Sequence, residues 1–446
     1  MKKSLHSLLD SILKLDPEDY KILMDALVAV KEGNKRNVDL EKIEQDKKLG
    51  VVFSEDNSIL LQFPKVLELE SYNVPDGVTR IGTNAFAYCW HLKKITLPSG
   101  LKVISDQAFT HTSIEEIVLP ENMTSIGAGA FQYSNLRQIT LPEGITEIAE
   151  NVFSLTELKS INIPSSVRTI KKNAFYETPI TSLTIPGSVE AIEDHALACM
   201  RYLQELIICD GVKKIGNSLC LGCKRLQKVR LPEILEEFGS SAFFGCVSLK
   251  EINIPQCLKE IPDSMFYECR ALQSVVLPEK LEKIGMQAFY WCEWLESVGT
   301  IPESVTEIGA GAFDCCFELL KINLPDGLTE ISRNLFSNCK KLANIVIPAS
   351  VQKIGVGAFI DCWKFIEITI PEGVTEIPDS AFWSCPELQK VTLPSTVVSI
   401  GDQAFRTCPK LKEINLPEGL ECVGKNAFSG CRSLRKSVKD RLKNFQ

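Results

Sequence analysis

The sequence predicts an α/β solenoid, a right-handed coil of about sixteen stacked units of 22–24 residues with a parallel sheet on its concave face and a helical N-terminal segment. Three observations predict this fold class. A Leu-Pro or Ile-Pro dipeptide returns every 22–24 residues, and each proline is followed by the same apolar pattern. The composition, 45% hydrophobic and 24% charged, is that of a folded protein. A unit this short buries its apolar side only by stacking on its neighbours.

Prolines mark the boundaries of the units. Their intervals are 23 residues once, 22 residues four times, and then mostly 23 residues with a single interval of 24. A period of about 20–29 residues with Leu-x-x-Leu-x-Leu spacing is typical of leucine-rich repeats. The prolines, with Cys209 taking the slot once, are Pro75, Pro98, Pro120, Pro142, Pro164, Pro186, Pro232, Pro255, Pro278, Pro302, Pro325, Pro348, Pro371, Pro394 and Pro417.

The unit of residues 302–325 shows how one coil is built. Residues 319–324 alternate inward apolar and outward polar side chains, which predicts a half-buried strand of a parallel sheet. Residues 305–309 form a second short extended segment. Ala312 and Phe313 then lie in a tight turn or short helix that returns the chain to the next strand.

Two columns of side chains follow from this stacking. Phenylalanine fills the eleventh position after the proline slot in fourteen units, with Leu197 and Cys220 as the exceptions. Successive rings are expected about one strand spacing apart, ~4.8 Å. Because both exceptions fall between Pro186 and Pro232, we expect altered curvature or a local packing defect there.

Cysteine forms the second column. Of the 17 cysteines, eleven lie three residues after the phenylalanine slot. In-register Cβ atoms one coil apart are ~4.8 Å from each other, outside the range of about 3.5–4.5 Å that a disulfide requires. We therefore expect buried, reduced thiols rather than a ladder of disulfides or metal ions. The column is Cys89, Cys223, Cys246, Cys269, Cys292, Cys316, Cys339, Cys362, Cys385, Cys408 and Cys431.

The repeat string [LI]P-x-x-[VL]-x-x-IG-x-x-AF-x-x-C-x-x-L-x-x-I closely resembles the BspA-like leucine-rich repeats, a bacterial surface-antigen type that is also abundant in some parasitic protists. Residues 51–64, which lead into residues 71–78, look like the hairpin that opens such arrays. The resemblance extends from about Val51 to Leu434. It implies protein binding or adhesion, often at the cell surface, and it brings no catalytic residues.

The ends differ from the repeats and divide the chain into four segments. These are a helical cap or docking segment at 1–50, an opening hairpin at 51–74, the solenoid at 75–434 and a C-terminal cap at 435–446. Helical spacing and capping residues predict helices over residues 5–13 and 17–33, and a weaker third helix over 39–48. The first segment either covers the open edge of the first coil or mediates docking or self-association.

Little in the sequence indicates chemistry. The four histidines are far apart, and Cys220-x-x-Cys223 has no second pair, so we expect no metal and no cofactor. The net charge of −8 argues against a nucleic-acid partner. No apolar run approaches the about 18 residues of a membrane span, so we expect no insertion. No signal peptide is visible, which favours the cytoplasm, whereas the family resemblance favours a secreted or surface location.

Aromatic side chains collect near the phenylalanine and cysteine columns, at positions that vary from coil to coil. Tryptophan and tyrosine are typical binding residues, although here they also suit a shielding role at the edge of the core. The sequence favours a non-enzymatic scaffold for a protein or glycan partner. The alternatives are a structural spacer and a cysteine-dependent redox or carbohydrate-active enzyme. The candidate partner-binding residues are Tyr267, Tyr290, Trp291, Trp294, Trp363 and Trp383.

Overall fold

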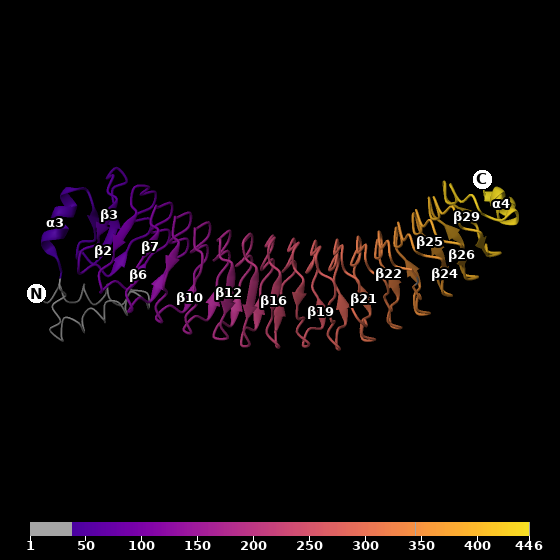
Figure 1. The fold of residues 1–446 in the computed structure, drawn as a ribbon, viewed down its shortest axis with the longest axis horizontal. Helices are drawn as coiled ribbons and strands as arrows, with labels where there is room; N and C mark the ends of the chain where they lie inside the picture. The colour runs from indigo at the N-terminus through magenta and orange to yellow at the C-terminus, as the bar shows by residue number, and fades with distance from the viewer. Residues whose placement is uncertain (1–37, 344, 446) are drawn as a thin grey trace, which may run out of the picture.

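Each unit forms one coil, and the coils stack into a gently curved rod (Figure 1). The computed structural model describes residues 38–343 and 345–445. The parallel-strand solenoid of about sixteen turns is confirmed, with little helix in the described part. The helices expected over residues 5–13 and 17–33 lie outside the described residues. The third expected helix is α3 (Leu40–Lys48), and the C-terminal end carries α4 (Lys436–Leu442) and the short helix η1 (Lys443–Phe445).

In eleven of the sixteen units the segment before the proline slot forms a strand, and these strands make three parallel sheets, which together we call the first sheet. Its strands pair in parallel, for example Ser182–Ile185 with Glu205–Ile208, and their side chains alternate between exposed and buried. The strands are β3 (Ser71–Asn73), β5 (Lys94–Thr96), β7 (Glu116–Ile117), β9 (Gln138–Ile139), β12 (Ser182–Ile185), β14 (Glu205–Ile208), β16 (Lys228–Arg230), β18 (Glu251–Ile252), β24 (Glu367–Thr369), β26 (Lys390–Thr392) and β28 (Glu413–Ile414).

The second extended segment of each unit forms a strand, and these strands make five sheets, parallel apart from the opening hairpin, which together we call the second sheet. It begins with a hairpin in which β1 (Val52–Phe53) pairs antiparallel with β2 (Ile59–Gln62). One two-residue strand per unit follows: β4 (Arg80–Ile81), β6 (Val103–Ile104), β8 (Ser125–Ile126), β10 (Glu147–Ile148), β11 (Thr169–Ile170), β13 (Ala191–Ile192), β15 (Lys214–Ile215), β17 (Glu237–Phe238), β19 (Glu260–Ile261), β20 (Lys283–Ile284), β21 (Glu307–Ile308), β22 (Glu330–Ile331), β23 (Lys353–Ile354), β25 (Glu376–Ile377), β27 (Ser399–Ile400) and β29 (Cys422–Val423).

The turn that carries the phenylalanine slot forms a third ladder between coils. In all sixteen units the residues two positions before and two positions after that slot have positive φ. Around Phe336, for example, Asn334 and Asn338 have φ values of 52° and 61°. The backbone amides of Asn334, Phe336 and Asn338 donate to carbonyls of the next coil, each 22 residues further along the chain. The donor–acceptor distances are 3.0, 2.9 and 2.7 Å in that order. This alternation of right- and left-handed residues makes the segment a tight turn and not a short helix.

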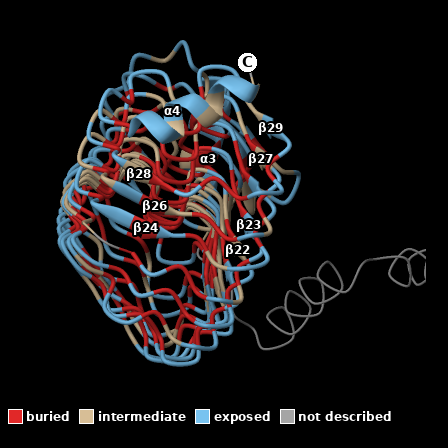
Figure 2. Ribbon diagram, turned by 90° about the vertical axis from the view of Figure 1, so that its right-hand side faces the viewer, coloured by how far each residue is buried: buried red, intermediate tan, exposed pale blue. Residues whose placement is uncertain are grey.

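The core of the rod is the stack of phenylalanine rings, and Figure 2 shows the buried residues running through its interior. Ring centroids of successive coils are 5.1–6.0 Å apart, from Phe63 to Phe175 and again from Phe243 to Phe428. The spacing exceeds the expected ~4.8 Å because the rings stack with an offset. Phe63 adds a ring ahead of the first repeat.

Several units carry an Ile-Gly pair at the end of the second extended segment, and the coils approach closely at that point. A Cβ atom on Gly285 would lie 2.5 Å from Asp263 Oδ1 and 2.6 Å from the Asp263 amide nitrogen. The same carboxylate oxygen accepts a hydrogen bond from the Met286 amide at 2.7 Å. An aspartate on one coil therefore holds the backbone of the next, and only glycine leaves room for it.

The stretch from Pro186 to Pro232 keeps the regular architecture. Leu197 and Cys220, which replace the rings, are fully buried, and the larger Leu219 and Met200 pack beside them. Both sheets run through this stretch without a break, and the rod shows no abrupt bend there (Figure 1). The only signs of the expected packing defect are unsatisfied polar atoms, such as the buried His195 Nδ1, which has no hydrogen-bond partner among the described residues.

Candidate binding site

The six candidate aromatic residues lie on one edge of the rod, in the turns that connect the second sheet to the first. Three of them, Tyr267, Tyr290 and Trp383, directly follow a phenylalanine of the core column. Trp291 occupies a left-handed position, with φ of 58°. Trp363 directly follows Cys362 of the cysteine column, and Trp294 lies two residues after Cys292. The residues therefore belong to two rows, which the structure treats differently.

The row beside the phenylalanine column contains a half-buried stack. Phe244, Tyr267 and Tyr290 lie on consecutive coils with centroids 4.3 and 4.6 Å apart, and Trp291 meets Tyr290 edge-on at 6.0 Å. Burial, with Cys315 and Asp314 close by, raises the pKa of Tyr290 to about 12, and burial also raises the pKa of Tyr267. Because the two tyrosines cover each other's faces, they suit the shielding role.

Asp314 continues this row below Tyr290 and is itself buried. Its Oδ1 accepts hydrogen bonds from Asn338 Nδ2 and from Cys315 Sγ, both at 3.3 Å. Burial raises the pKa of the Asp314 carboxyl, although these hydrogen bonds act in the opposite direction. Burial and the neighbouring carboxylate raise the pKa of the Cys315 thiol to about 12. The cluster is a satisfied polar network between coils.

The row that follows the cysteine column is more exposed. Trp294 has 56% of its surface exposed and Trp363 has 44%. Between them on successive coils lie Phe317 and Lys340, whose ammonium is 4.2 Å from the Phe317 centroid and 4.7 Å from the Trp363 centroid. We call these four residues, Trp294, Phe317, Lys340 and Trp363, the tryptophan strip. The strip spans four consecutive coils. Lys340 lies between the rings of Phe317 and Trp363, whereas Trp294 has no ring or cation contact with a described residue.

The other two tryptophans each have a cation of their own. Arg270 lies over Trp291 at 4.9 Å, and it also pairs with Glu293 at 3.3 Å. Arg406 lies over Trp383 at 5.9 Å. No described aromatic ring contacts Trp383, so the structure does not join it to the strip.

Phe317 and Lys340 are absent from the set chosen from the sequence. Each directly follows a cysteine of the column, as Trp363 does, so the shared position in the repeat was a signal for both. Reading the sequence for aromatic residue types alone overlooks a lysine held between rings. The position after each cysteine identifies Phe317, Lys340 and Trp363, whereas Trp294 lies one residue further along its coil.

A second aromatic group lies near the N-terminal end. Tyr88, His111 and Tyr133 stack on consecutive coils at 4.7 and 4.5 Å, and Trp90 contacts the first two. Lys65 lies 4.8 Å from the centroid of Tyr88. Trp90 follows Cys89 as Trp363 follows Cys362, so it occupies the same repeat position at the other end of the rod.

The cysteine column lies inside this edge, and all eleven of its side chains are buried free thiols. From Cys223 onward, each Sγ donates to the carbonyl of the phenylalanine slot on the preceding coil, as Cys339 does to Phe313 at 3.2 Å. Burial raises the pKa of Cys89 to about 11, and burial also raises the pKa of Cys339. The thiolate form that nucleophilic or redox chemistry needs is therefore disfavoured in this column.

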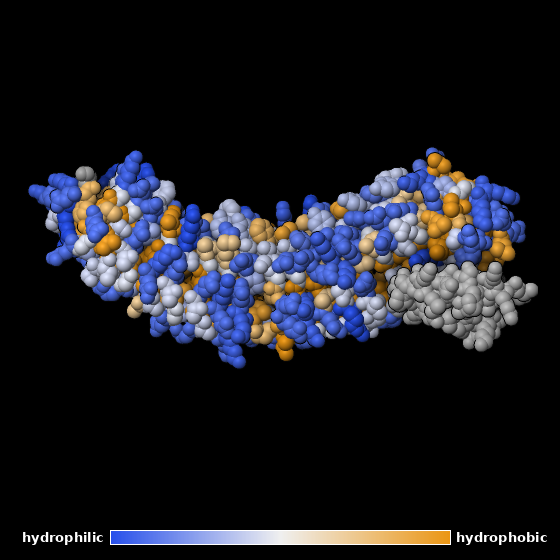
Figure 3. Space-filling model, turned by 180° about the vertical axis from the view of Figure 1, so that it is seen from behind, coloured by the Kyte–Doolittle hydropathy of each residue, from blue (hydrophilic) through white to orange (hydrophobic). Residues whose placement is uncertain are grey.

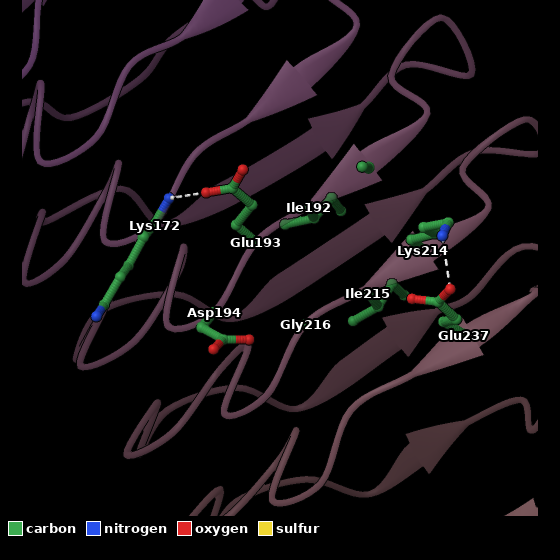
Figure 4. Close-up of a pocket in the computed structure, with 9 residues that line it drawn as sticks. Lys172, Ile192, Glu193, Asp194, Lys214, Ile215, Gly216 and Glu237 are labelled. Atoms are coloured by element: carbon green, nitrogen blue, oxygen red, sulfur yellow. Dashed lines mark hydrogen bonds and ion pairs between the residues drawn. The ribbon is translucent and has the colours of Figure 1, made fainter.

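The hollows on the surface are shallow. One of about 320 Å³ lies on the second sheet around Ala191 and Gly216, where small side chains leave a dent. Figure 4 shows Lys214 paired to Glu237 at 2.5 Å and the Lys172 backbone amide donating to Glu193. Within residues 38–343 and 345–445, no three histidine, cysteine, aspartate or glutamate side chains are placed to hold a metal ion.

The surface as a whole is mixed in character. Figure 3 shows apolar residues on one face in small groups among polar ones, without one continuous apolar band. None of the helices in the described part of the chain is long and apolar enough to cross a membrane.

Comparison with known proteins gives one family and several similar structures. The family model for the BspA type leucine-rich repeat region, of six copies, matches residues 62–179, 168–296, 259–389 and 375–445. No curated protein matches the chain. A leucine-rich repeat protein from Bacteroides ovatus ATCC 8483 is 25% identical over 87% of this chain and 92% of its own, with a TM-score of 0.61. A leucine rich cell surface protein from Faecalibacterium prausnitzii A2-165 is 29% identical over 60% of this chain and 82% of its own, with a TM-score of 0.44.

Proposed function

Because the chain belongs to the BspA-type leucine-rich-repeat family, whose scaffolds commonly bind proteins, we propose that it is a non-enzymatic scaffold that holds a protein partner against the tryptophan strip. The observation that carries this proposal is the arrangement of Lys340 between Phe317 and Trp363. The strip places exposed tryptophan, which is enriched among residues that dominate binding energy, beside a fixed cation.

The backbone conformation of the turns that carry the aromatic residues supports the proposal that these residues do more than pack against the core. The left-handed positions of the turn hold glycine, asparagine or serine in many coils, residues that suit positive φ. Trp291 occupies such a position at a cost of about 1 kcal/mol relative to glycine. The repeat does not require an aromatic residue there or at the position after the cysteine.

The strip is also rigid before a partner arrives. The indole nitrogen of Trp363 donates to Asp361 Oδ1 at 3.1 Å, which fixes the orientation of the ring. The two rings restrict Lys340, and no described carboxylate forms an ion pair with its ammonium. Ordered side chains lose little entropy on binding. A free ammonium beside two rings suits a partner that presents a carboxylate next to an apolar side chain.

The test compares two tryptophan variants of the full chain. A pull-down from host and bacterial surface extracts first identifies a partner, and surface plasmon resonance then measures its affinity. The double variant Trp294→Ala/Trp363→Ala should bind about 30-fold more weakly, which corresponds to about 2 kcal/mol for lost hot-spot contacts. The control is Trp90→Ala, because Trp90 has the same repeat position and 57% exposure at the other end of the rod.

Trp291→Ala combined with Trp383→Ala measures how far the contact extends along the edge. Circular dichroism should show that every variant stays folded. Unchanged affinity in the Trp294/Trp363 double variant, or a loss confined to Trp90→Ala, would exclude the strip as the binding surface.

A further inference from the structure

The last coil of the rod has an uncovered backbone edge. In interior coils the carbonyls of the second sheet accept amides of the next coil, as Val398 and Ile400 do from Cys422 and Gly424. The amides of the turn ladder likewise donate onward, as that of Phe405 does at 2.8 Å. The equivalent groups of the last coil are the carbonyls of Glu421 and Val423 and the amides of Asn426, Phe428 and Gly430. None of these five groups bonds to another described residue.

The rest of that end is covered. The amide of Arg435 donates to the carbonyl of Lys412 at 3.3 Å, and the guanidinium of Arg441 donates to the carbonyls of Leu416 and Pro417 at 2.6 Å. Helix α4 thus bonds to the edge of the first sheet, and Lys439 of α4 also donates to the carbonyl of Arg432 at 3.1 Å. Figure 1 shows α4 at the C-terminal end of the rod. The unpaired groups run along residues 421–430.

The opposite end of the rod does not share this feature. There β1 pairs with the outer edge of β2, and α3 packs its fully buried Ile43 against the first coil. Asp46 of α3 is also buried, and it accepts a hydrogen bond from the hydroxyl of Tyr72 at 2.7 Å. The open edge at residues 421–430 is therefore a property of one end. Unpaired edges of this kind pair readily with another chain.

The order of the unpaired groups indicates which chain fits. Residues 421–430 present two acceptors followed by three donors, so each acceptor meets a donor when the row pairs with a reversed copy of itself, and the central Asn426 amide takes no partner in this register. In an antiparallel pairing centred between residues 425 and 426, the carbonyl of Glu421 faces the amide of Gly430 of a second copy. The carbonyl of Val423 likewise faces the amide of Phe428. We propose that two copies of this chain associate end to end through residues 421–430, related by a two-fold axis.

This register makes one side-chain contact that can be tested. Cys422 lies opposite Ser429 of the second copy, and both residues are exposed on the outer side of the edge. In this register the two residues lie between the two hydrogen-bonded positions. A disulfide requires Cα atoms about 4.4–6.8 Å apart, so a cross-link between them reports the pairing. Two-fold symmetry produces the contact twice per dimer.

The experiment uses the full-length chain and a new cysteine at position 429. Ser429→Cys should form a covalent dimer under mild oxidation with oxidised glutathione, seen on non-reducing gels. The matched control is Glu418→Cys, which places an exposed cysteine on the same coil but outside the pairing. A second control, Ser429→Cys/Cys422→Ser, removes the partner thiol and should abolish the cross-link. Sedimentation velocity of the wild type should show a species of twice 49.6 kDa that grows with concentration.

Two results would overturn the proposal. One is a wild type that sediments as a monomer at every concentration, with Ser429→Cys cross-linking no faster than Glu418→Cys. The other is a wild-type dimer with no cross-link in Ser429→Cys, because that result places the contact elsewhere, for example in residues 1–37. Loss of partner binding in the tryptophan variants does not affect this test, since the strip and the open edge are separate surfaces.

Discussion

Removing one ring from the middle of the phenylalanine column tests how the rod is held together. Phe313 is fully buried and stacks between Phe289 at 5.4 Å and Phe336 at 5.8 Å. Phe313→Ala therefore deletes contacts on both faces of the ring. Phe428 is the matched control, because it ends the column, is only partly buried and has a single stacked neighbour at 5.3 Å.

The magnitude follows from burial and stacking. Truncating a buried phenylalanine to alanine costs about 3–5 kcal/mol. Stacked aromatic pairs add about 0.5–1.5 kcal/mol each, and Phe313 loses two of them. We expect Phe313→Ala to lower the free energy of unfolding by about 4–5 kcal/mol, near the upper end. Phe428→Ala should cost roughly half as much, because one face of its ring already lacks a stacked partner.

Urea unfolding followed by circular dichroism measures the total loss, and hydrogen exchange measures where it occurs. Because each coil contacts only its neighbours, exchange should accelerate mainly in the coils of Phe289, Phe313 and Phe336. Equal losses for Phe313→Ala and Phe428→Ala would refute the reasoning. So would a loss below about 1 kcal/mol for the interior variant, because the column would then not be a stack of mutually supporting rings.

Three further predictions concern other contacts. Gly285→Ala should destabilise the protein by about 1–3 kcal/mol through overpacking against the preceding coil, whereas Gly100→Ala, with nothing within 4 Å of its added Cβ, should change the urea midpoint little. Asp46→Ala should cost about 1–3 kcal/mol by leaving the Tyr72 hydroxyl unpaired, and unchanged hydrogen exchange in α3 would contradict this. Burial raises the pKa of Cys89 to about 11 from its ordinary 9.0, and it also raises the pKa of the column thiols Cys292 and Cys339. The folded state then holds more protons than the unfolded state above pH 9, so the free energy of unfolding should fall as pH rises, by about 1.4 kcal/mol per pH unit for each such thiol; a urea midpoint equal at pH 8 and pH 10 would contradict this.

Much of the fold was predictable because the same local pattern repeats. The interval between prolines determines the length of each coil, and the parallel registers shift by 22, 23 or 24 residues, as that interval requires. The phenylalanine column was also predictable, since equal positions in equal coils must stack. The turn ladder was not, because its left-handed positions hold residues as different as Trp291, Asn338 and Gly357. Such residue types carry no common signal of positive φ.

The candidate site was predictable only in part. The sequence placed aromatic residues on one edge, but it did not separate the half-buried pair Tyr267 and Tyr290 from the exposed Trp294 and Trp363. Exposure depends on which side chain lies one coil away, and that neighbour is 22–24 residues distant in the chain. The same separation hid Lys340, which becomes notable only when Phe317 and Trp363 lie on either side of it.

The sequence by itself determined the period, the number of coils and the burial of the cysteine column, because these properties follow from one short pattern copied along the chain. The tertiary structure alone decided which aromatic faces stay open, where a cation lies between rings, and which backbone groups at residues 421–430 lack a partner. Those outcomes depend on contacts between neighbouring coils and on how α4 lies over the last one. A repeat pattern predicts that coils stack. It does not predict which side chain on the next coil each residue contacts, or which backbone groups remain without a partner.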